Sequence, residues 1–279
     1  MANRKEKQRL DVLCVERGLF PSRREAQSAI MTGMVLVNGE KATKAGSLFC
    51  TADDITLKSS YSPRRFVSRG GLKLEKALAD FAIDLNGRVC LDVGASTGGF
   101  TDCMLRNGAD TVYAIDVGYG QLDWQLRNDP RVVVKERLNA RYLKPEDLYG
   151  SDLDSAYRPA DFAAVDCSFI SLAKIVPVLA SVMKADRLQA VCLVKPQFEA
   201  GREAVRKGVV RDPGVHRQVL KSVREVCLGC GLVLLKATYS PVKGPAGNIE
   251  FLVMLETCGE PMTDAALDEI VDRAFSELS

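Results

Sequence analysis

The residues best placed to do chemistry follow directly on hydrophobic runs. Asp116 ends the run TVYAID, Asp166 follows DFAAV, and Lys195 follows AVCLV. A glycine-rich turn that begins at Gly94 follows a fourth run, RVCLDV. Short apolar runs of this kind are typical of buried strands, and ligands of open α/β sheets bind beyond the carboxyl ends of the strands. We therefore expect all four positions to meet at one site, with Lys195 pointing into it rather than into solvent.

The glycine-rich turn, LDVGASTGGF, is compatible with three chemistries. A dinucleotide fingerprint requires G-x-G-x-x-G, and Ser96 takes the place of the second glycine, where a pyrophosphate must approach the backbone. The turn also fits G-x-S-x-G, the nucleophile elbow, and Ser96, Asp166 and His216 follow the hydrolase order. An elbow lies on a central strand after several others, whereas this turn follows the first strand of its domain and His216 begins a predicted helix. Both positions argue against a hydrolase.

S-adenosylmethionine is the third candidate ligand of this turn. It has no pyrophosphate, so the turn needs only to approach a methionine moiety closely, which glycines at 94, 98 and 99 permit. An acid at the end of the next strand, Asp116, would hold the ribose hydroxyls. The turn and this acid together favour methyl transfer over the two other chemistries.

The elements that must position these residues alternate along the larger part of the chain. A helix over GLKLEKALADFAI precedes the predicted strands RVCLDVG, TVYAIDVG, VVVKE, DFAAVD, AVCLV, LVLLKATY and IEFLVMLE. This alternation predicts an open, mostly parallel α/β sheet. An amphipathic helix in PMTDAALDEIVDRAFSELS ends the chain. Its apolar stripe comprises Leu267, Ile270, Val271, Ala274, Phe275 and Leu278.

A small basic head precedes this domain. Residues 1–70 contain 13 Lys and Arg against 7 Asp and Glu, and the remainder contains 25 against 29. A helix over LDVLCVERGL, a capping box from Ser22 to Glu25, an Asn38-Gly39 hairpin turn and a strand in DDITLK are predicted within it. A basic head on a mildly acidic body indicates a polyanion-binding module. The expected boundaries are 1–60 for the head, 61–68 for a linker and 69–279 for the larger domain.

The sequence of the head is similar to a known RNA-binding module. RLDVLCVERGLFPSRREAQSAIMTGMVLVNGEKA resembles the alpha-L RNA-binding domain found in a small-subunit ribosomal protein, pseudouridine synthases and tyrosyl-tRNA synthetases. The resemblance implies that basic side chains of the head face RNA phosphates. Such contacts supply affinity and a steep salt dependence rather than sequence reading.

The motifs of the whole chain resemble those of the TlyA family. They are VSRGGLKLEKAL, LDVGASTGGFTD, AIDVGYGQLDWQLRNDPRV, ERLNARYL, VDCSFISL, LVKPQFE and GPAGNIEF. Members of that family are often labelled haemolysins but are rRNA 2′-O-methyltransferases with an FtsJ-like catalytic domain. The resemblance implies a Rossmann-like class I methyltransferase fold with a seven-stranded, mostly parallel sheet and an antiparallel last strand. It also implies a Lys-Asp-Lys-Glu tetrad, here Lys73, Asp166, Lys195 and Glu250.

The same resemblance sets the expected ligands. S-adenosylmethionine is the expected cofactor, a cytidine ribose of 16S or 23S rRNA within ribosomal subunits is the expected substrate, and capreomycin sensitivity is the expected consequence. The expected cofactor-binding residues are Asp92, Gly94, Ala95, Ser96, Gly98, Gly99, Phe100, Asp116, Asn139 and Asp166. The expected RNA-binding residues are Arg4, Lys7, Arg9, Arg23, Arg24, Lys41, Lys44, Arg65, Arg69, Arg202, Arg206 and Lys207.

Such a tetrad suits methyl transfer from a sulfonium to a ribose 2′-hydroxyl. The hydroxyl is a poor nucleophile, so it must be aligned and must lose its proton as the new bond forms. A lysine accepts that proton only when it is neutral, and burial or a second ammonium nearby favours the neutral form. Lys73 and Lys195 are the candidate bases, held by Asp166 and Glu250, and the sequence leaves open which lysine is neutral.

A predicted long loop over 197–214 carries several basic residues, among them Arg211. Loops of this length are usually functional or disordered. We interpret the loop as a flap that contacts RNA, with a solvated, disordered loop as the alternative.

The composition argues against several function classes. No window approaches the roughly 18 uninterrupted apolar residues of a membrane helix, and the basic start lacks the apolar core of a secretory signal. This argues against a membrane-active haemolysin and for a cytoplasmic protein. Nine scattered cysteines in a chain without an export signal predict reduced core thiols. Cys227 and Cys230 have CxxC spacing but no second pair, so no metal site is expected. We expect a monomer; a hydrolase and an RNA-binding protein without catalysis are the other rival functions.

Overall fold

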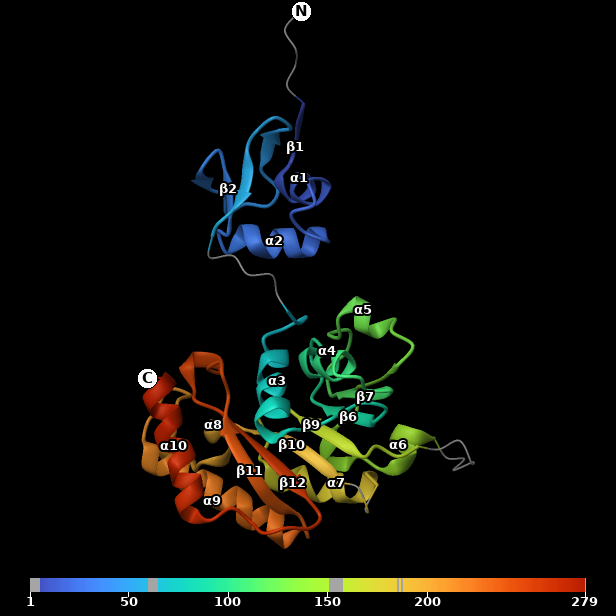
Figure 1. The fold of residues 1–279 in the computed structure, drawn as a ribbon, viewed down its shortest axis with the longest axis vertical. Coiled ribbons are helices and arrows are strands. Elements are labelled where there is room, and N and C mark those ends of the chain that lie inside the picture. Colours follow the sequence, from blue (N-terminus) through green and yellow to red (C-terminus); the bar gives the residue numbers. More distant parts are fainter. Residues whose placement is uncertain (1–5, 60–64, 151–157, 185, 187, 279) are drawn as a thin grey trace, which may run out of the picture. The chain divides into compact units, whose positions relative to one another are not determined.

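The computed structural model describes residues 6–59, 65–150, 158–184, 186 and 188–278 (Figure 1). The chain divides into two compact units, Met1–Arg64 and Arg65–Ser279. The predicted linker over 61–68 lies partly outside the described residues. Its described part, from Arg65 onward, belongs to the second unit.

Two helices and two small antiparallel sheets make up the first unit. Ser22 caps the second helix, because its Oγ accepts a hydrogen bond from the Glu25 amide at 3.3 Å. Asn38 and Gly39 have φ of 51° and 83°, as a tight hairpin turn requires. These predictions are confirmed, whereas the β1–β4 sheet has no signal in the sequence, because each strand has only 3 residues. The elements are β1 (Lys7–Arg9), α1 (Leu10–Glu16), α2 (Arg23–Met31), β2 (Val35–Val37), β3 (Glu40–Lys41), β4 (Leu48–Cys50) and β5 (Ile55–Leu57).

A seven-stranded sheet forms the centre of the second unit, with strand order β11-β12-β10-β9-β6-β7-β8. β12 runs antiparallel to both of its neighbours, and the other neighbouring strands pair in parallel. This topology confirms the expected Rossmann-like methyltransferase fold. The strands are β6 (Val89–Val93), β7 (Thr111–Asp116), β8 (Val132–Glu136), β9 (Phe162–Val165), β10 (Gln189–Val194), β11 (Val233–Tyr239) and β12 (Phe251–Glu256).

Helices cover both faces of this sheet (Figure 1). Side chains of α3 and α4 pack on one face around Phe162 and Leu193, and those of α7, α9 and α10 pack on the other around Val165 and Val194. Burial on both faces explains why the strands read as continuous apolar runs. The helices are α3 (Gly70–Phe81), α4 (Gly99–Arg106), α5 (Trp124–Arg127), α6 (Pro145–Tyr149), α7 (Val176–Val182), α8 (Pro196–Glu199), α9 (Pro213–Gly229) and α10 (Asp264–Leu278), with short 3₁₀ turns η1 (Ala140–Tyr142), η2 (Leu172–Lys174), η3 (Arg202–Ala204) and η4 (Pro245–Gly247).

The register of the sheet brings the predicted site residues to one edge. β6 and β9 pair in parallel up to their last residues, so the glycine-rich turn and the loop after β9 leave the sheet side by side. In the antiparallel pair of β10 and β12, Val194 faces Phe251. The next residue of one strand and the preceding residue of the other, Lys195 and Glu250, therefore lie beside each other at this edge.

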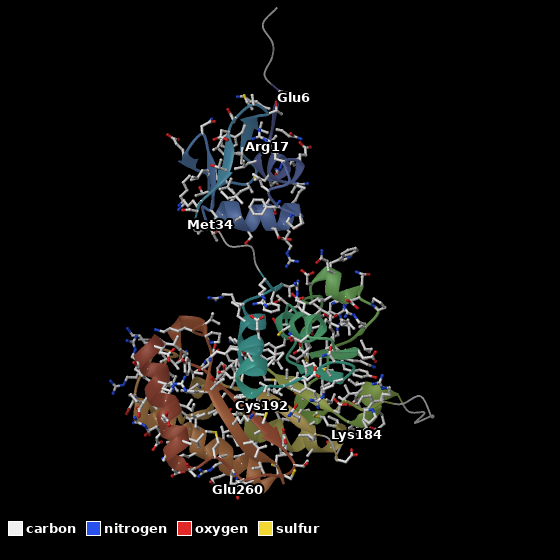
Figure 2. All side chains as sticks on the ribbon, in the orientation of Figure 1. Glu6, Arg17, Met34, Lys184, Cys192 and Glu260 are labelled. Carbon is white, nitrogen blue, oxygen red and sulfur yellow. The ribbon has the colours of Figure 1, made fainter. Side chains whose placement is uncertain are left out.

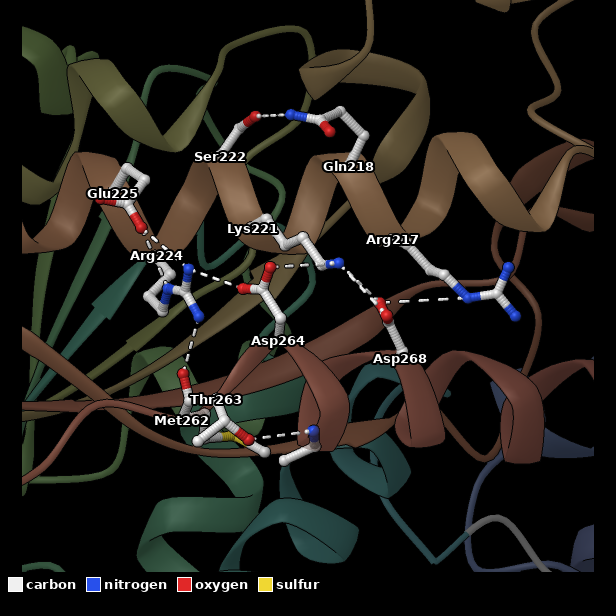
Figure 3. Close-up of polar contacts among 11 residues, drawn as sticks. Arg217, Gln218, Lys221, Ser222, Arg224, Glu225, Met262, Thr263, Asp264 and Asp268 are labelled. Atoms are coloured by element: carbon white, nitrogen blue, oxygen red, sulfur yellow. Dashed lines mark hydrogen bonds and ion pairs between the residues drawn. The ribbon is translucent and has the colours of Figure 1, made fainter.

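The last helix, α10, is fastened to α9 by a ladder of ion pairs (Figure 3). Lys221 Nζ lies 3.4 Å from Asp264 and 3.1 Å from Asp268, and Arg224 Nη2 lies 2.8 Å from Asp264. Half-exposed pairs of this kind contribute only about 0.2–1 kcal/mol each, so burial of the predicted apolar stripe supplies most of the attachment. In that stripe Leu267, Val271 and Ala274 are fully buried, and Ile270, Phe275 and Leu278 are partly buried.

All nine cysteines are free thiols, and Cys192 lies in the interior of the second unit (Figure 2). Burial raises the pKa of Cys90 and Cys227 to about 12, so both are neutral. Cys230 is half-buried and Cys258 exposed. The buried cysteines lie in the core, as the sequence predicts.

Candidate active site

The glycine-rich turn brings backbone against backbone at the end of β6. Gly94 has φ of 90°, and a side chain there would place its Cβ 2.7 Å from the Asp166 carbonyl oxygen. A Cβ on Gly99 would lie 2.2 Å from Ser68 Oγ. The Ser96 amide, whose residue has φ of 49°, donates to Asp116 Oδ2 at 2.7 Å and so ties the turn to the end of β7. Two of the glycines are thus required by close approach, as the sequence predicts.

The four tetrad residues form two short ion pairs. Lys73, from α3, lies with Nζ 2.6 Å from Glu250 Oε2, and these side chains are 11% and 0% exposed. Lys195 Nζ lies 2.6 Å from Asp166 Oδ1 and donates to Ser168 Oγ at 2.8 Å. Each lysine is therefore paired with one carboxylate, Lys73 with Glu250 and Lys195 with Asp166.

One cavity of about 370 Å³ unites the tetrad with the glycine-rich turn. Glu250 Oε1 is buried there without a hydrogen-bond partner among the described residues. Gly244 packs so closely on this carboxylate that a Cβ would lie 2.1 Å from Oε1. The lining residues are Ser68, Arg69, Gly70, Lys73, Gly94, Ala95, Ser96, Thr97, Gly99, Phe100, Asp166, Ser168, Lys195, Val242, Lys243, Gly244 and Glu250.

Four of the expected cofactor residues lie outside this lining. Asp92 is fully buried beneath the turn, where its Oδ2 accepts from Thr101 Oγ1 at 2.6 Å, and burial raises its pKa to about 7. Gly98 is the N-cap of α4. Asp116 accepts from two backbone amides, and Asn139 is exposed and caps η1. Six others, Gly94, Ala95, Ser96, Gly99, Phe100 and Asp166, line the cavity.

The sequence reasoning missed several lining residues, of which Ser168 contacts a tetrad member directly. Beside it, Phe169 is 90% exposed with φ of 63°, and its ring lies 5.0 Å from that of Phe198. The only signal in the sequence is position, since both follow within three residues of Asp166. The other missed residues are Ser68, Gly70, Thr97, Val242, Lys243 and Gly244.

The structure separates the members of the hydrolase arrangement. His216 lies in α9, is fully buried, and packs edge-on against Phe251 and Phe275. Its Nε2 bonds to the Val210 carbonyl oxygen at 3.0 Å, and burial lowers its pKa. It does not line the cavity that holds Ser96. His216 is a core residue, and the hydrolase reading is not supported.

Ser96→Ala is expected to keep near-normal methyl transfer, because the turn uses the backbone amide of this residue and not its hydroxyl. His216→Ala removes a buried ring and should lower the free energy of unfolding by roughly 2–5 kcal/mol, by analogy with other large-to-small core changes. Its turnover per folded molecule should be unchanged. Methylation assays corrected for the folded fraction check both; loss of turnover with intact S-adenosylmethionine binding in either variant would contradict this.

Comparison with known proteins agrees with the geometry. The model of the FtsJ-like methyltransferase family matches residues 66–257, and that of the S4 domain matches residues 8–55. The 16S/23S rRNA (cytidine-2'-O)-methyltransferase TlyA of Mycobacterium tuberculosis is 45% identical over 96% of this chain and 97% of its own. Hemolysin A of Brachyspira hyodysenteriae is 41% identical over 88% of this chain and 98% of its own. The chain belongs to the TlyA family. A solved structure from Streptococcus thermophilus is 43% identical, with a TM-score of 0.73, over 98% of this chain and 97% of that one.

These matches confirm the predicted resemblance to the TlyA family of rRNA methyltransferases. They also confirm that the head is an S4 domain, the module called alpha-L above. Among the described residues of this TlyA-family chain, no helix combines the length and apolarity needed to cross a bilayer. Within the same residues, no cluster of three or more His, Cys, Asp or Glu side chains could hold a metal ion.

In the S4 unit of this TlyA-family chain, a buried carboxylate organises two of the expected RNA-binding arginines. Asp11 is fully buried and accepts from Arg9 Nε at 3.0 Å, Arg23 Nη2 at 3.0 Å and Gln27 Nε2 at 2.7 Å. These arginines hold the pKa of Asp11 well below its usual range. Their side chains remain 47% and 55% exposed, and each guanidinium keeps N–H donors that Asp11 does not use.

The other expected RNA-binding residues are spread over both units. Lys7, Arg24, Lys41 and Lys44 are exposed on the S4 unit, whereas Arg4 lies outside the described residues. Arg65 pairs with Glu75 at 2.7 Å, and Arg69 lines the cavity. In the second unit Arg202 belongs to η3, and Arg206 and Lys207 are exposed.

The predicted long loop over 197–214 contains more structure than the sequence indicates. It includes the end of α8, η3 and the start of α9. Arg206 and Val209 form a two-way backbone bridge at 3.1 and 3.0 Å, so Lys207 is presented at a tight turn. Asn248 fastens this turn from a remote loop, because it donates to the Gly208 carbonyl at 2.9 Å and accepts from the Val210 amide at 3.2 Å. The disordered alternative is therefore wrong for this segment.

Proposed function

We propose that this chain transfers a methyl group from S-adenosylmethionine to the 2′-hydroxyl of a cytidine in 16S or 23S rRNA, within a ribosomal subunit. The observation that carries the proposal is the pair of 2.6 Å contacts, Lys73 with Glu250 and Lys195 with Asp166, in the cavity that the glycine-rich turn also lines. The relative from Mycobacterium tuberculosis bears the name of this activity.

The turn and its surroundings fit S-adenosylmethionine. The cavity volume lies within the range of small-molecule sites, roughly 300–1,000 Å³. Gly94 and Gly99 bring bare backbone to the lining where a side chain would collide. Asp116 keeps lone pairs for the ribose hydroxyls beyond those used by two backbone amides. When bound, the cofactor supplies an electrophilic methyl group on a sulfonium.

Lys195 is the proposed acceptor of the hydroxyl proton. Asp166 and Ser168 both contact its Nζ, which fixes the nitrogen at the edge of the cavity. Lys195 must release its own proton before this step, and its neutral amine then takes the proton as the ribose oxygen becomes a nucleophile. Asp166 then stabilises the resulting ammonium, so charge is compensated without movement of either side chain.

We assign the second pair, Lys73 and Glu250, to binding the same hydroxyl. The fully buried Glu250 carboxylate uses Oε2 for Lys73, and its Oε1 is buried with no hydrogen-bond partner among the described residues. An unpaired buried carboxylate oxygen is costly, so a hydroxyl donor there would be bound strongly. We assign Oε1 to the target ribose and Lys73 to the fixed positive charge that orients Glu250.

Phe169 offers a platform for the base of the target nucleotide. A ring that is 90% exposed, in a backbone conformation with φ of 63°, is costly to maintain in a loop without a ligand. Recognition of single-stranded RNA commonly stacks splayed bases on such rings. The ring lies one residue from Ser168, which contacts Lys195, so a stacked base would bring its ribose toward the tetrad.

The S4 unit supplies the proposed affinity for ribosomal RNA. Its arginines, aligned by Asp11, would contact phosphates without reading the sequence. Ribosomal subunits as substrate imply that the reaction takes place in the cytoplasm. We expect the protein to act as a monomer.

Arg23→Ala is expected to weaken binding to ribosomal subunits and to make the negative slope of log K against log salt less steep by about 0.7–0.9, because one phosphate contact is lost. Arg9 and Gln27 still satisfy Asp11 in this variant, so the unit should remain folded. Lys184→Ala, which removes an exposed charge from the catalytic unit, is the matched control. Binding isotherms at several salt concentrations give both slopes, and an unchanged slope for Arg23→Ala would remove this residue from the interface.

The reaction itself is tested with purified protein, labelled S-adenosylmethionine and ribosomal subunits. Label in the 2′-O position of a cytidine supports the proposal, and mapping in a deletion strain identifies the nucleotide and the subunit. Binding to subunits without any transfer would favour an RNA-binding protein without catalysis. Label on a base rather than on a ribose would refute the assigned chemistry.

A further inference from the structure

Glu199 is a half-buried acid that the proposed reaction does not use. It ends α8, shortly after Lys195, and both of its carboxylate oxygens accept hydrogen bonds from a different segment. Oε2 accepts from Ser171 Oγ at 2.6 Å, and Oε1 accepts from the Leu172 amide at 2.8 Å. Ser171 in turn caps η2, because its Oγ accepts from the Ala173 amide at 3.1 Å. One carboxylate thus holds the beginning of η2.

The segment that Glu199 holds is the loop between β9 and η2, which carries three groups of the site. The tetrad aspartate and Ser168 both contact Lys195 Nζ, at 2.6 and 2.8 Å. Phe169 packs against the phenylalanine of α8, with the ring centres 5.0 Å apart. The beginning, middle and end of this loop are therefore all fastened to residues 195–199, which leave the end of β10.

Holding the first amide of η2 with a half-buried carboxylate from another segment has a desolvation cost. Burial raises the pKa of Glu199, so the folded chain holds this group against a desolvation cost. The local serine Ser171 already caps the Ala173 amide, so the ordinary N-cap of η2 does not need this carboxylate. A tie from α8 achieves something that a local cap does not, because it fixes the exits of β9 and β10 relative to each other.

We propose that Glu199 is a positioning residue for methyl transfer, one that keeps Asp166 against Lys195 and the Phe169 ring at the site. The inference rests on the proposed function. Glu199 does not line the cavity and is remote from the glycine-rich turn in the chain. Its removal should therefore lower turnover and leave the affinity for S-adenosylmethionine unchanged.

The test compares Glu199→Ala with Glu199→Gln and with Glu203→Ala, an exposed acid of η3 that serves as control. Single-turnover methylation of ribosomal subunits at saturating cofactor should be about 10–100-fold slower for Glu199→Ala, the usual effect of misplaced reacting groups. Glu199→Gln should recover most of the rate, because its amide oxygen still accepts from Leu172 and its amide nitrogen can donate to Ser171 Oγ. Calorimetry should give the same cofactor affinity for all variants within about twofold.

Two results would overturn the role. One is a Glu199→Ala rate equal to that of Glu203→Ala. The other is a loss of cofactor affinity in proportion to the loss of rate, which indicates general support of the cavity. If Glu199→Ala does not fold, Ser171→Ala removes one of the two bonds and should show a smaller loss confined to the rate; no loss there also refutes the proposal. A wild-type chain that methylates no ribosomal substrate refutes the proposed function itself.

Discussion

Lys195→Ala is expected to slow methyl transfer by 10²–10⁴-fold, about 3–5 kcal/mol in the barrier, while S-adenosylmethionine still binds. The physical reason is that different residues bind the cofactor and serve the hydroxyl. The glycine-rich turn and Asp116 would hold the cofactor, whereas Lys195 Nζ, held by Asp166 and Ser168, serves the incoming hydroxyl. Single-turnover methylation of ribosomal subunits, beside calorimetry with the cofactor, measures the two effects separately.

Lys195→Arg distinguishes a base from an electrostatic clamp. A guanidinium keeps the positive charge and the hydrogen bonds to Asp166, but it is not deprotonated at any working pH. No recovery of rate is expected. Near-normal turnover of this variant would show that Lys195 acts only through its charge, and the assignment of the proton acceptor would then have to move to Lys73.

Much of this site could be predicted from the residues that follow apolar runs, because buried parallel strands fix the edge of the sheet at which those residues lie. The apolar runs before Asp166 and Lys195 are buried on both faces, so each run had to be a central strand and each polar residue had to leave the sheet at its carboxyl edge. Nothing in those runs identifies a neighbour, however. The contact of Lys73 with Glu250 joins residues 177 positions apart. Only the resemblance to the TlyA family placed both residues in one tetrad, and it did not indicate which lysine pairs with which carboxylate.

The residues that sequence reasoning missed share a physical cause. Ser168 and Phe169 belong to a short loop with no periodicity, and an aromatic residue after a strand usually indicates core rather than an exposed ring. The apparent order in the loop over 197–214 comes from Asn248, a side chain far away in the chain, so local composition could not report it. The hydrolase order of Ser96 and His216 was misleading, because the order of two residues in the sequence does not determine the distance between them in the fold.

Glu250→Ala is expected to destabilise the fold as well as abolish turnover. Lys73, with its side chain 11% exposed, would be left as a buried ammonium without its partner at 2.6 Å. Removing one member of a buried pair typically costs roughly 3–5 kcal/mol, because the remaining charge is uncompensated. Urea denaturation gives the change in the free energy of unfolding, and the folded fraction should methylate subunits no faster than Lys195→Ala.

The double variant Lys73→Met/Glu250→Met separates stability from catalysis at this pair. Two straight apolar side chains of similar length remove both charges, and such replacements are often neutral or stabilising by about 1–4 kcal/mol. We expect unfolding free energy to return to near the wild-type value while methyl transfer stays lost, because the Oε1 acceptor assigned to the ribose is absent. Recovery of turnover together with stability would mean that Lys73 and Glu250 only support the fold, and that Lys195 and Asp166 carry the reaction alone.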